Sequence, residues 1–499
     1  MRSPALRPAV SAERHWTFAQ SILGIRPWSA NARQTYDRAM GELLTNALAE
    51  APAPALELDD EIVALGRRLA RRSSLLRHAR RAAQDRGMAL VARDPQVRAA
   101  LFRLVDVAPA CAGPAELAEH LSAFLAGVER RTVAAVASRA AVAPGTRWAA
   151  GRAATVAVRA MAGRFIVGET PAAATRTLRS LWEHGAAVSV DLLGEATVTP
   201  AEGRAYAARC DDALVRLAAD AARWPARPLL ETDAAGPLPR VNLSVKVTAL
   251  TPLVRAEAPE RGRADAAALL RPLLRRARDV GAHLHIDMES LDSRELILEL
   301  VLELLSEPEF AAGPSAGIVL QAYLRDAEET LEHVLDWSRA TPRTPPLTVR
   351  LVKGAYWDHE TIEAAQHGWD PPVWTEKVES DRCFERVTRR LLDAWADERL
   401  VRPAIASHNL RSIAHAIVYA RHRGLAPADL ELQVLRGLGD DLQDALAAEG
   451  LRGRTYCPVG DLVAGMAYLV RRLLENTSND SFLASRVGGA ELDRLLSAP

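Results

Sequence analysis

The sequence lacks paired cysteines. Its four cysteines, Cys111, Cys210, Cys383 and Cys457, lie far apart, and none belongs to a CxxC motif. This spacing argues against a disulfide framework and against a cysteine-based zinc site. We therefore expect reduced thiols in a cytoplasmic protein.

Long apolar runs are missing as well. No stretch approaches the ~20 uninterrupted apolar residues that a membrane-spanning helix needs. The N-terminal stretch MRSPALRPAV contains no apolar core of a signal peptide, so none is expected. Weak peripheral attachment to the inner face of a membrane stays open.

The sequence also has no excess of charge of either sign. Its 499 residues include 63 Lys and Arg and 63 Asp and Glu, which gives a net charge of zero. This balance provides no basic field for a polyanion, so nucleic acid is not an expected partner. The length predicts two or three domains, or one large barrel with an extra region.

Residues 1–165 are rich in Ala, Leu and Arg at helical spacing. The stretch DDEIVALGRRLARRSSLLRHARRAAQDRG begins with acids and continues with bases, and its apolar residues recur every three or four positions. Its arginine clusters are interpreted as solvated helix faces, with a nucleic-acid or lipid patch as the less favoured alternative. We predict an all-helical region without chemistry that the sequence identifies.

After residue 165, short β-branched runs alternate with helical stretches. Strands that alternate with helices predict a parallel sheet, and eight such units predict a (βα)8 TIM barrel with its active site at the C-terminal strand ends. An open doubly wound sheet is less favoured because no GxGxxG opens its first helix. The runs are AAVSVDLLGE, RVNLSVKV, AHLHIDMES, AGIVLQAY, LTVRLVKGAY, RPAIASHN, LELQVLRG and GRTYCPVG.

Nearly every predicted strand ends in a hydrogen-bonding or ionisable side chain. Apolar residues or turn formers are expected at the ends of ordinary packed strands. In a barrel these ends meet at one mouth, so the pattern predicts a functional site there. The side chains are Glu195, Lys246, Asp287, Gln321, Arg350, Lys353, His408, Gln433 and Tyr456.

The stretch VRLVKGAYW, residues 349–357, ends a buried strand with two cations, a glycine and two aromatics. The glycine lets backbone N–H groups approach a ligand, and a cation beside a flavin stabilises its reduced, anionic ring. This combination suits a flavin nucleotide. The alternative is an edge strand with snorkelling Arg350 and Lys353 stems.

The stretch HLHIDME, residues 283–289, alternates polar and apolar residues, so its polar side chains share one strand face. One interpretation is a buried strand with polar ends. The alternative is a metal-dependent barrel hydrolase, in which Lys353, His408 and Asp461 follow in the order of such ligands.

The stretch YLVRRLLENTSND places Tyr468, Arg471, Arg472 and Glu475 on one helix face. One interpretation is an outer barrel helix with a surface pair between Arg471 and Glu475. The other is a two-arginine clamp on a carboxylate, since the planar guanidinium donates two parallel hydrogen bonds.

Taken in order, these motifs resemble the proline dehydrogenase family, most closely the proline dehydrogenase half of bifunctional proline utilisation proteins. The resemblance covers about residues 165–483. The motifs are VDLLGEATVTPAE, SVKVTAL, IDMES, LQAY, VRLVKGAYWD, PVWTEK, ASHN, YCPVG and YLVRRLLENTSNDSF.

The resemblance implies a helical arm over 1–165, a distorted (βα)8 barrel over 166–485 and a tail over 486–499. It implies an oxidoreductase with non-covalent FAD, which oxidises L-proline to Δ1-pyrroline-5-carboxylate by hydride transfer from C5 to the flavin N5. This is the first step of proline catabolism to glutamate. The implied electron acceptor is a membrane quinone.

The resemblance also implies roles for individual residues. The catalytic residues are Lys246, Asp287 and Arg350. Substrate contacts are Lys246, Tyr456, Arg471 and Arg472, with Glu195 and Glu475 ordering the arginines. Cofactor contacts are Met288, Gln321, Arg350, Val352, Lys353, Gly354, Ala355, Trp357, Thr375, Lys377, Ser407 and His408.

The sequence departs from the family pattern in a few places. The typical ATHN reads ASHN, so Ser407 keeps a hydroxyl, and SVKVTAL lacks the Leu-Ser that follows the lysine in bifunctional relatives. No aldehyde dehydrogenase half follows the barrel, so a separate pyrroline-5-carboxylate dehydrogenase is the expected partner for the next step. A non-catalytic helical docking role for such a dehydrogenase is the remaining alternative.

Overall fold

The computed structural model describes residues 58–75, 163–194, 197–461 and 490–499, with isolated positions between 103 and 156 and at 465. The chain divides into a unit Met1–Asp59 and a compact unit Asp60–Pro499. The following description concerns the second unit. The predicted boundaries 1–165, 166–485 and 486–499 remain predictions.

A closed barrel of eight parallel strands forms the centre of this unit. Each strand pairs with its neighbour along the chain, and β1 closes the ring by pairing with both β10 and β4. Every run of the sequence that was predicted as a strand is one, so the (βα)8 prediction is confirmed. The strands are β1 Ala186–Leu192, β4 Asn242–Lys246, β5 His283–Asp287, β6 Ser315–Gln321, β7 Leu347–Val352, β8 Val401–Ala406, β9 Glu431–Leu435 and β10 Gly453–Val459.

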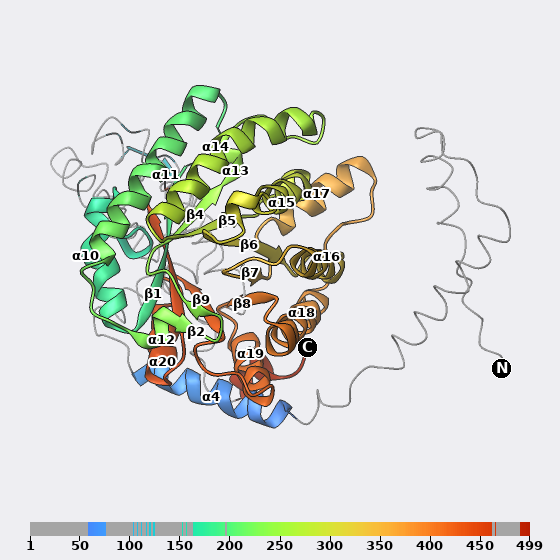
Figure 1. The fold of residues 1–499 in the computed structure, drawn as a ribbon. Coiled ribbons are helices and arrows are strands. Elements are labelled where there is room, and N and C mark those ends of the chain that lie inside the picture. Colours follow the sequence, from blue (N-terminus) through green and yellow to red (C-terminus); the bar gives the residue numbers. More distant parts are fainter. Residues whose placement is uncertain are drawn as a thin grey trace, which may run out of the picture. The chain divides into compact units, whose positions relative to one another are not determined.

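Helices surround the strands in a ring (Figure 1). The starts of some helices follow sequence signals. For example, α11 begins after Thr199, whose side chain accepts a hydrogen bond from the N–H of Glu202. The Glu202 carboxylate in turn accepts from the N–H of Thr199. The ring contains α10 Pro171–Glu183, α11 Pro200–Ala221, α13 Val247–Leu250, α14 Pro259–Asp279, α15 Leu291–Leu305, α16 Ala327–Ala340, α17 Trp357–His367, α18 Lys377–Glu398, α19 Leu410–His422 and α20 Asp440–Ala448. Within the described part of the chain, every helix is too short or too polar to span a lipid bilayer.

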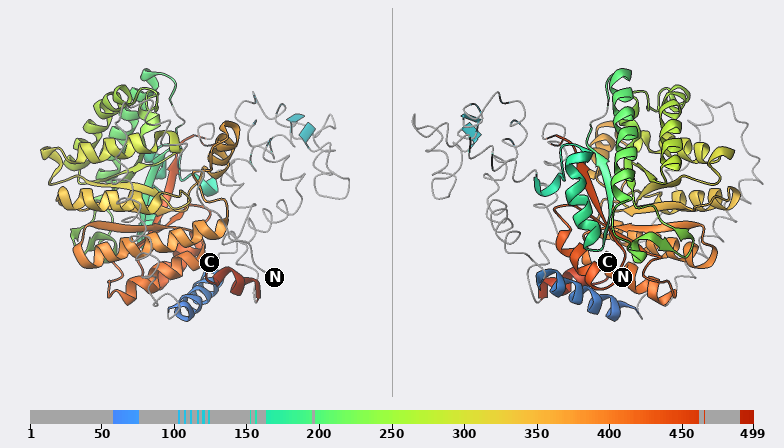
Figure 2. Two further views of the ribbon diagram at one scale, coloured as in Figure 1. Left: turned by 90° about the vertical axis from the view of Figure 1, so that its right-hand side faces the viewer. Right: turned by 60° about the vertical axis from the view of Figure 1, so that its left-hand side comes forward.

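The α4 helix, Asp59–Leu75, packs against α20 and against α22, Ala490–Leu496. Arg72 pairs with Glu449 at 2.7 Å, and the fully buried Leu496 fills the space above Gly66. Figure 2 shows α4 and α22 side by side, although they lie near opposite ends of the chain. The two segments therefore stabilise each other on the outside of the barrel.

The inside of the barrel is charged near the N-terminal strand ends. A hairpin of β2 (Thr232–Asp233) and β3 (Gly236–Pro237) follows α12, Pro228–Glu231, and places Asp233 against Arg402 at 2.7 Å. Glu431 pairs with Arg452 at 2.6 Å and with Arg454 at 2.8 Å. Buried charges are tolerated when they are paired in this way. Apolar packing is correspondingly concentrated between the strands and the helices.

We predict that Arg402→Met lowers the free energy of unfolding by about 3–5 kcal/mol, because it leaves the buried Asp233 without its bidentate partner. Urea denaturation measures the loss. Arg216→Met is the matched control, because Arg216 forms an ion pair of the same 2.7 Å length with Asp212 on the exposed surface. That control should cost less than about 1 kcal/mol. Equal losses in both variants would contradict this account of the charged interior.

Candidate active site

A cavity of about 440 Å³ opens at the C-terminal ends of the strands, and all eight strands contribute side chains to it. Most of the predicted site residues line this one cavity, as expected for a barrel mouth. These are Lys246, Asp287, Met288, Gln321, Arg350, Val352, Lys353, Gly354, Ala355, Lys377, Ser407, His408 and Tyr456.

Asp287 is the centre of the hydrogen-bond network in the cavity. Its Oδ1 accepts from Arg350 Nη1 at 2.8 Å, and its Oδ2 accepts from the Tyr456 hydroxyl at 2.7 Å. Lys246 Nζ lies 3.7 Å from the same carboxylate and donates to Asp191 at 2.7 Å. Groups from β1, β4, β5, β7 and β10 are thereby fixed relative to one another.

Arg350 extends from β7 across the barrel interior. Both of its terminal nitrogens lie 3.3 Å from Ser244 Oγ, and Nη2 is 3.4 Å from Ser189 Oγ. The guanidinium carbon lies 5.3 Å from the centre of the Tyr456 ring, within cation–π range. These contacts hold the guanidinium at the floor of the cavity.

The charges of the network set its protonation states. Burial raises the pKa of Tyr456 well above its usual value, and the Asp191 and Asp287 carboxylates raise it further. Burial alone would lower the pKa of Lys246, but the same two carboxylates outweigh this effect and raise it. Tyr456 therefore stays a neutral hydrogen-bond donor and Lys246 stays a cation over the physiological pH range.

A second cluster of charges lies where the cavity reaches α18. Lys353 and Lys377 both pair with Asp381, the latter at 2.7 Å. Burial lowers the pKa of Lys353, and Asp381 opposes that shift. Two cations share one carboxylate, and Lys377 is the first residue of α18, so this end of the cavity suits a bound anion such as a phosphate.

Gly354 lies two residues after the end of β7, at a position that only glycine fits. Its φ of +133° lies in a region that residues with a side chain rarely adopt, and a Cβ there would lie 2.2 Å from Tyr323 Cδ1. The backbone is held at this position because Tyr323 N–H donates to the Lys353 carbonyl at 2.7 Å. The turn that carries Lys353 therefore requires glycine.

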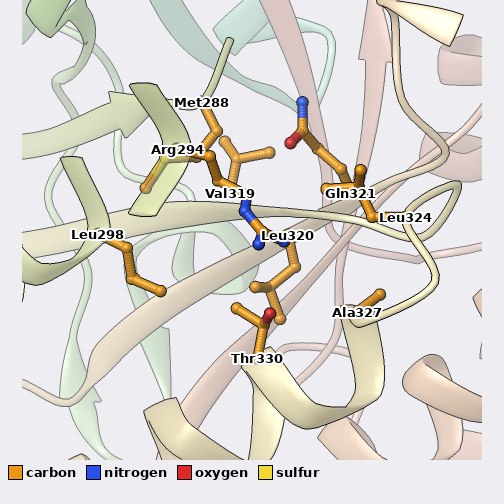
Figure 3. A pocket seen from close by; sticks show the side chains of 9 residues that line it. All are labelled: Met288, Arg294, Leu298, Val319, Leu320, Gln321, Leu324, Ala327 and Thr330. Carbon is orange, nitrogen blue, oxygen red and sulfur yellow. The ribbon is translucent and has the colours of Figure 1, made fainter. Parts of the chain in front are cut away.

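Gln321 lies on the cavity side of β6. Figure 3 shows its amide pointing away from Leu320, which packs toward Leu298 and Thr330 around a small cavity of about 10 Å³. Gln321 Nε2 donates to the backbone carbonyl of Glu289 at 2.9 Å. The amide therefore braces the loop after β5.

Two predicted cofactor contacts, Trp357 and Thr375, do not line the cavity. Trp357 is 42 % exposed, and its Nε1 donates to the Trp374 carbonyl at 2.9 Å. A β-bridge between Leu324 and Val373 fixes the same segment. Trp357 thus supports the segment that carries Lys377, and its direct cofactor contact remains a prediction, as does that of Thr375.

The predicted clamp residues Arg471 and Arg472 lie outside the described residues, as do Glu195 and Glu475. Their roles remain predictions.

Sequence reasoning missed several side chains of the cavity, above all Asp191 and Glu289. The run AAVSVDL contains a usable signal, because Ser189 and Asp191 alternate with valines and so share the inward face. Glu289 was placed on a strand face without a role. It accepts from the Thr248 hydroxyl, and burial raises its pKa.

The two histidines of β5 do not form the predicted alternative metal site. His283 Nε2 lies 3.1 Å from His285 Nδ1, and His283 Nδ1 lies 2.8 Å from Ser315 Oγ. His408 Nε2 accepts from the Leu435 N–H at 2.9 Å. Among the described residues, no three His, Cys, Asp or Glu side chains are grouped to hold a metal ion. The imidazoles are instead used in hydrogen bonds within the protein.

The sequence model of the family described as proline dehydrogenase matches residues 174–485, which include the whole cavity. The chain belongs to the proline dehydrogenase family. The preceding residues 59–165 match the proline utilization A N-terminal domain. The resemblance that the motifs carried is therefore confirmed.

Similar proteins of known identity support the same family assignment. The bifunctional protein PutA of Salmonella typhimurium is 34 % identical over 353 residues, which are 69 % of this chain and 25 % of that protein. The proline dehydrogenase of Deinococcus radiodurans is 28 % identical over 65 % of this chain and 88 % of its own length. A solved structure of proline utilization A from Bdellovibrio bacteriovorus, inactivated by N-propargylglycine, superimposes with a TM-score of 0.78 and 35 % identity. It covers 88 % of this chain and 44 % of that one. The chain thus spans about a quarter of the curated bifunctional relative.

We predict that Gly354→Ala destabilises the protein by about 1–3 kcal/mol more than Gly368→Ala, because only the former forces a side chain against Tyr323. Gly368 is a suitable control because it also has a positive φ, +68°, but a Cβ there would meet nothing within 4 Å. Urea denaturation of both variants gives the comparison. Similar losses would show that the backbone conformation, and not the contact with Tyr323, is the constraint.

Proposed function

We propose that this chain is an FAD-dependent proline dehydrogenase that oxidises L-proline to Δ1-pyrroline-5-carboxylate. The observation that carries the proposal is the network of Asp287, Arg350, Tyr456 and Lys246 at the mouth of a barrel whose sequence belongs to this family. When bound, FAD supplies a hydride acceptor at N5 for the C5 hydrogen of proline.

The residues of the cavity fit FAD. Lys353 and Lys377 would provide the cations for its pyrophosphate, and Gly354 lines the same cavity. Arg350 at the floor of the cavity provides the positive charge that stabilises a reduced, anionic flavin ring. Gln321, Met288, Ser407 and His408 would complete the contacts along the cofactor.

In the substrate half of the cavity, both described cations are already engaged by carboxylates. The cations of Lys246 and Arg350 face the carboxylates of Asp191 and Asp287. A proline carboxylate therefore needs further cations, which Arg471 and Arg472 would supply. Tyr456, held neutral by its surroundings, would pack against the proline ring and hold Asp287 in place.

Hydride loss from C5 requires the lone pair of the proline nitrogen, so the reacting amine is neutral. Any excess of positive charge that Arg471 and Arg472 add would favour this form, because it disfavours a further positive charge nearby. We propose a quinone in the membrane as the final electron acceptor, reached by peripheral attachment of a cytoplasmic protein. A separate pyrroline-5-carboxylate dehydrogenase would consume the product.

We predict that the purified protein is yellow and that its flavin absorbance bleaches on addition of L-proline under anaerobic conditions. The visible absorption spectrum, with and without proline, measures both effects. D-proline is the matched control, because the mirror-image molecule cannot place its carboxylate, nitrogen, ring carbons and reacting C5 hydrogen in the same positions at once. A colourless protein that stays colourless after incubation with FAD would contradict the proposal.

We further predict that Arg471→Met and Arg472→Met each weaken proline binding by about 1.5–3 kcal/mol, the range for a hydrogen bond to a charged group. FAD affinity should change little, because the clamp serves the substrate. Spectral titration with proline and with FAD separates the two affinities. Unchanged proline affinity in both variants would show that these arginines lie away from the substrate.

A further inference from the structure

A hydrogen-bonded chain of side chains lies in the barrel interior below Asp287. It begins at Ser315 Oγ, 2.8 Å from His283 Nδ1, and continues from His283 Nε2 to His285 Nδ1 over 3.1 Å. His283 is 5 % exposed and His285 is fully buried. None of the catalytic roles proposed above uses this chain.

This row of hydrogen-bonded side chains ends at His285 Nε2, an atom without a partner among the described residues. His285 Nε2 is buried and forms no hydrogen bond to another described residue, and the same holds for Arg350 Nε. Buried polar atoms of this kind are nearly always hydrogen-bonded, to protein or to an ordered water. One of these two atoms is a donor, because a guanidinium N–H can only donate.

The charge of Arg350 influences which ring nitrogen of His285 carries the proton. Burial lowers the pKa of His285 well below its usual value, and the nearby Arg350 cation lowers it further, so the ring is neutral. A cation near a neutral imidazole favours a lone pair on the ring nitrogen that faces it, which we take to be Nε2 because Nδ1 contacts His283. The proton then lies on Nδ1, which donates to His283 Nε2, and His283 Nδ1 in turn donates to Ser315 Oγ.

We propose that one bound water joins Arg350 Nε to His285 Nε2, so that the histidine chain positions the guanidinium of Arg350. The water accepts from Arg350 Nε and donates to His285 Nε2. Ser244, which pairs in register with His285 and contacts Arg350, offers it a further polar neighbour. His285 is then a positioning residue that acts through Arg350.

Gly317 provides the space that this arrangement needs. A Cβ at Gly317 would lie 2.4 Å from His285 Nδ1 and 2.6 Å from its Cε1, so the imidazole occupies the room of the missing side chain. The orientation of the ring therefore depends on a glycine in the neighbouring strand β6.

This inference rests on the proposed function, because Arg350 is expected to stabilise the reduced flavin. Without the hydrogen bond at Nε, the guanidinium of Arg350 keeps its contacts to Asp287, Ser189 and Ser244. It loses the hydrogen bond that fixes its orientation on the Nε side. The reduced form of the cofactor is then less stabilised. Proline binding changes less, because the carboxylate is held elsewhere.

We test this with His285→Leu in the FAD-loaded enzyme. We expect kcat to fall about tenfold, the effect of one lost hydrogen bond, with KM for proline nearly unchanged. The midpoint potential of the flavin should become more negative, by about 30 mV if the reduced form is stabilised tenfold less. His285→Gln, whose amide oxygen can accept at the position of Nε2, should restore most of the potential.

Thr388→Val is the control for removal of a buried polar group. Thr388 lies on α18, is fully buried, and its hydroxyl has no partner among the described residues. It should leave the potential and kcat unchanged. An unchanged potential in His285→Leu, or an equal shift in Thr388→Val, would overturn the proposal.

A crystal structure of the wild-type holoenzyme gives a second test that does not depend on the folding of a variant. We expect an ordered water within about 3 Å of both Arg350 Nε and His285 Nε2. Absence of a shared water at a resolution where others are ordered would overturn the proposal. Failure of the proposed function itself would look different, since proline would then not bleach even the wild-type flavin.

Discussion

The buried ion pair between Asp287 and Arg350 is the interaction on which the rest of the cavity depends. Both side chains are almost fully enclosed, and a charge left alone in such surroundings costs several kcal/mol. Because the pair is satisfied, Asp287 can also accept from Tyr456 and attract Lys246 without moving. Contacts that come from five separate strands are therefore organised around one carboxylate.

The polar barrel interior explains how that position is maintained. Many TIM barrels fill their interior with branched apolar side chains. Here the inward positions carry Glu431 with Arg452 and Arg454 at one end, the histidine pair in the middle and Arg350 above. Each polar layer is hydrogen-bonded internally, and such bonds are directional, whereas apolar packing is not. The side chains at the floor of the cavity are thus oriented by hydrogen bonds and ion pairs that extend through the barrel interior.

Alternation along the chain was enough to predict the strands and most of the cavity, because each inward polar residue at a strand end is visible as a break in an apolar run. Alternation was not enough to predict which side chains bind one another in the cavity. Asp191 meets Lys246 across 55 residues and Tyr456 meets Asp287 across 169, and no local pattern records such pairs. The histidines of β5 illustrate the same limit: their spacing fits a metal site, and only the folded structure shows that His283 Nε2 lies within hydrogen-bond distance of His285 Nδ1. The resemblance assigned Trp357 to the cofactor, and only the structure shows that its Nε1 also donates to the Trp374 carbonyl.

The described cations at the mouth of the cavity are already paired with carboxylates, which limits how a substrate with a carboxylate can bind. Lys246 and Arg350 are each engaged by a carboxylate, so bringing in a carboxylate substrate without further cations would leave a buried net negative charge. Cations that complete the site must therefore be attracted more strongly when substrate is present than when it is absent. By reciprocity, the substrate binds more tightly when those cations are in place. The predicted clamp of Arg471 and Arg472 would supply such cations, whereas the cofactor end of the cavity has its own lysine pair on Asp381.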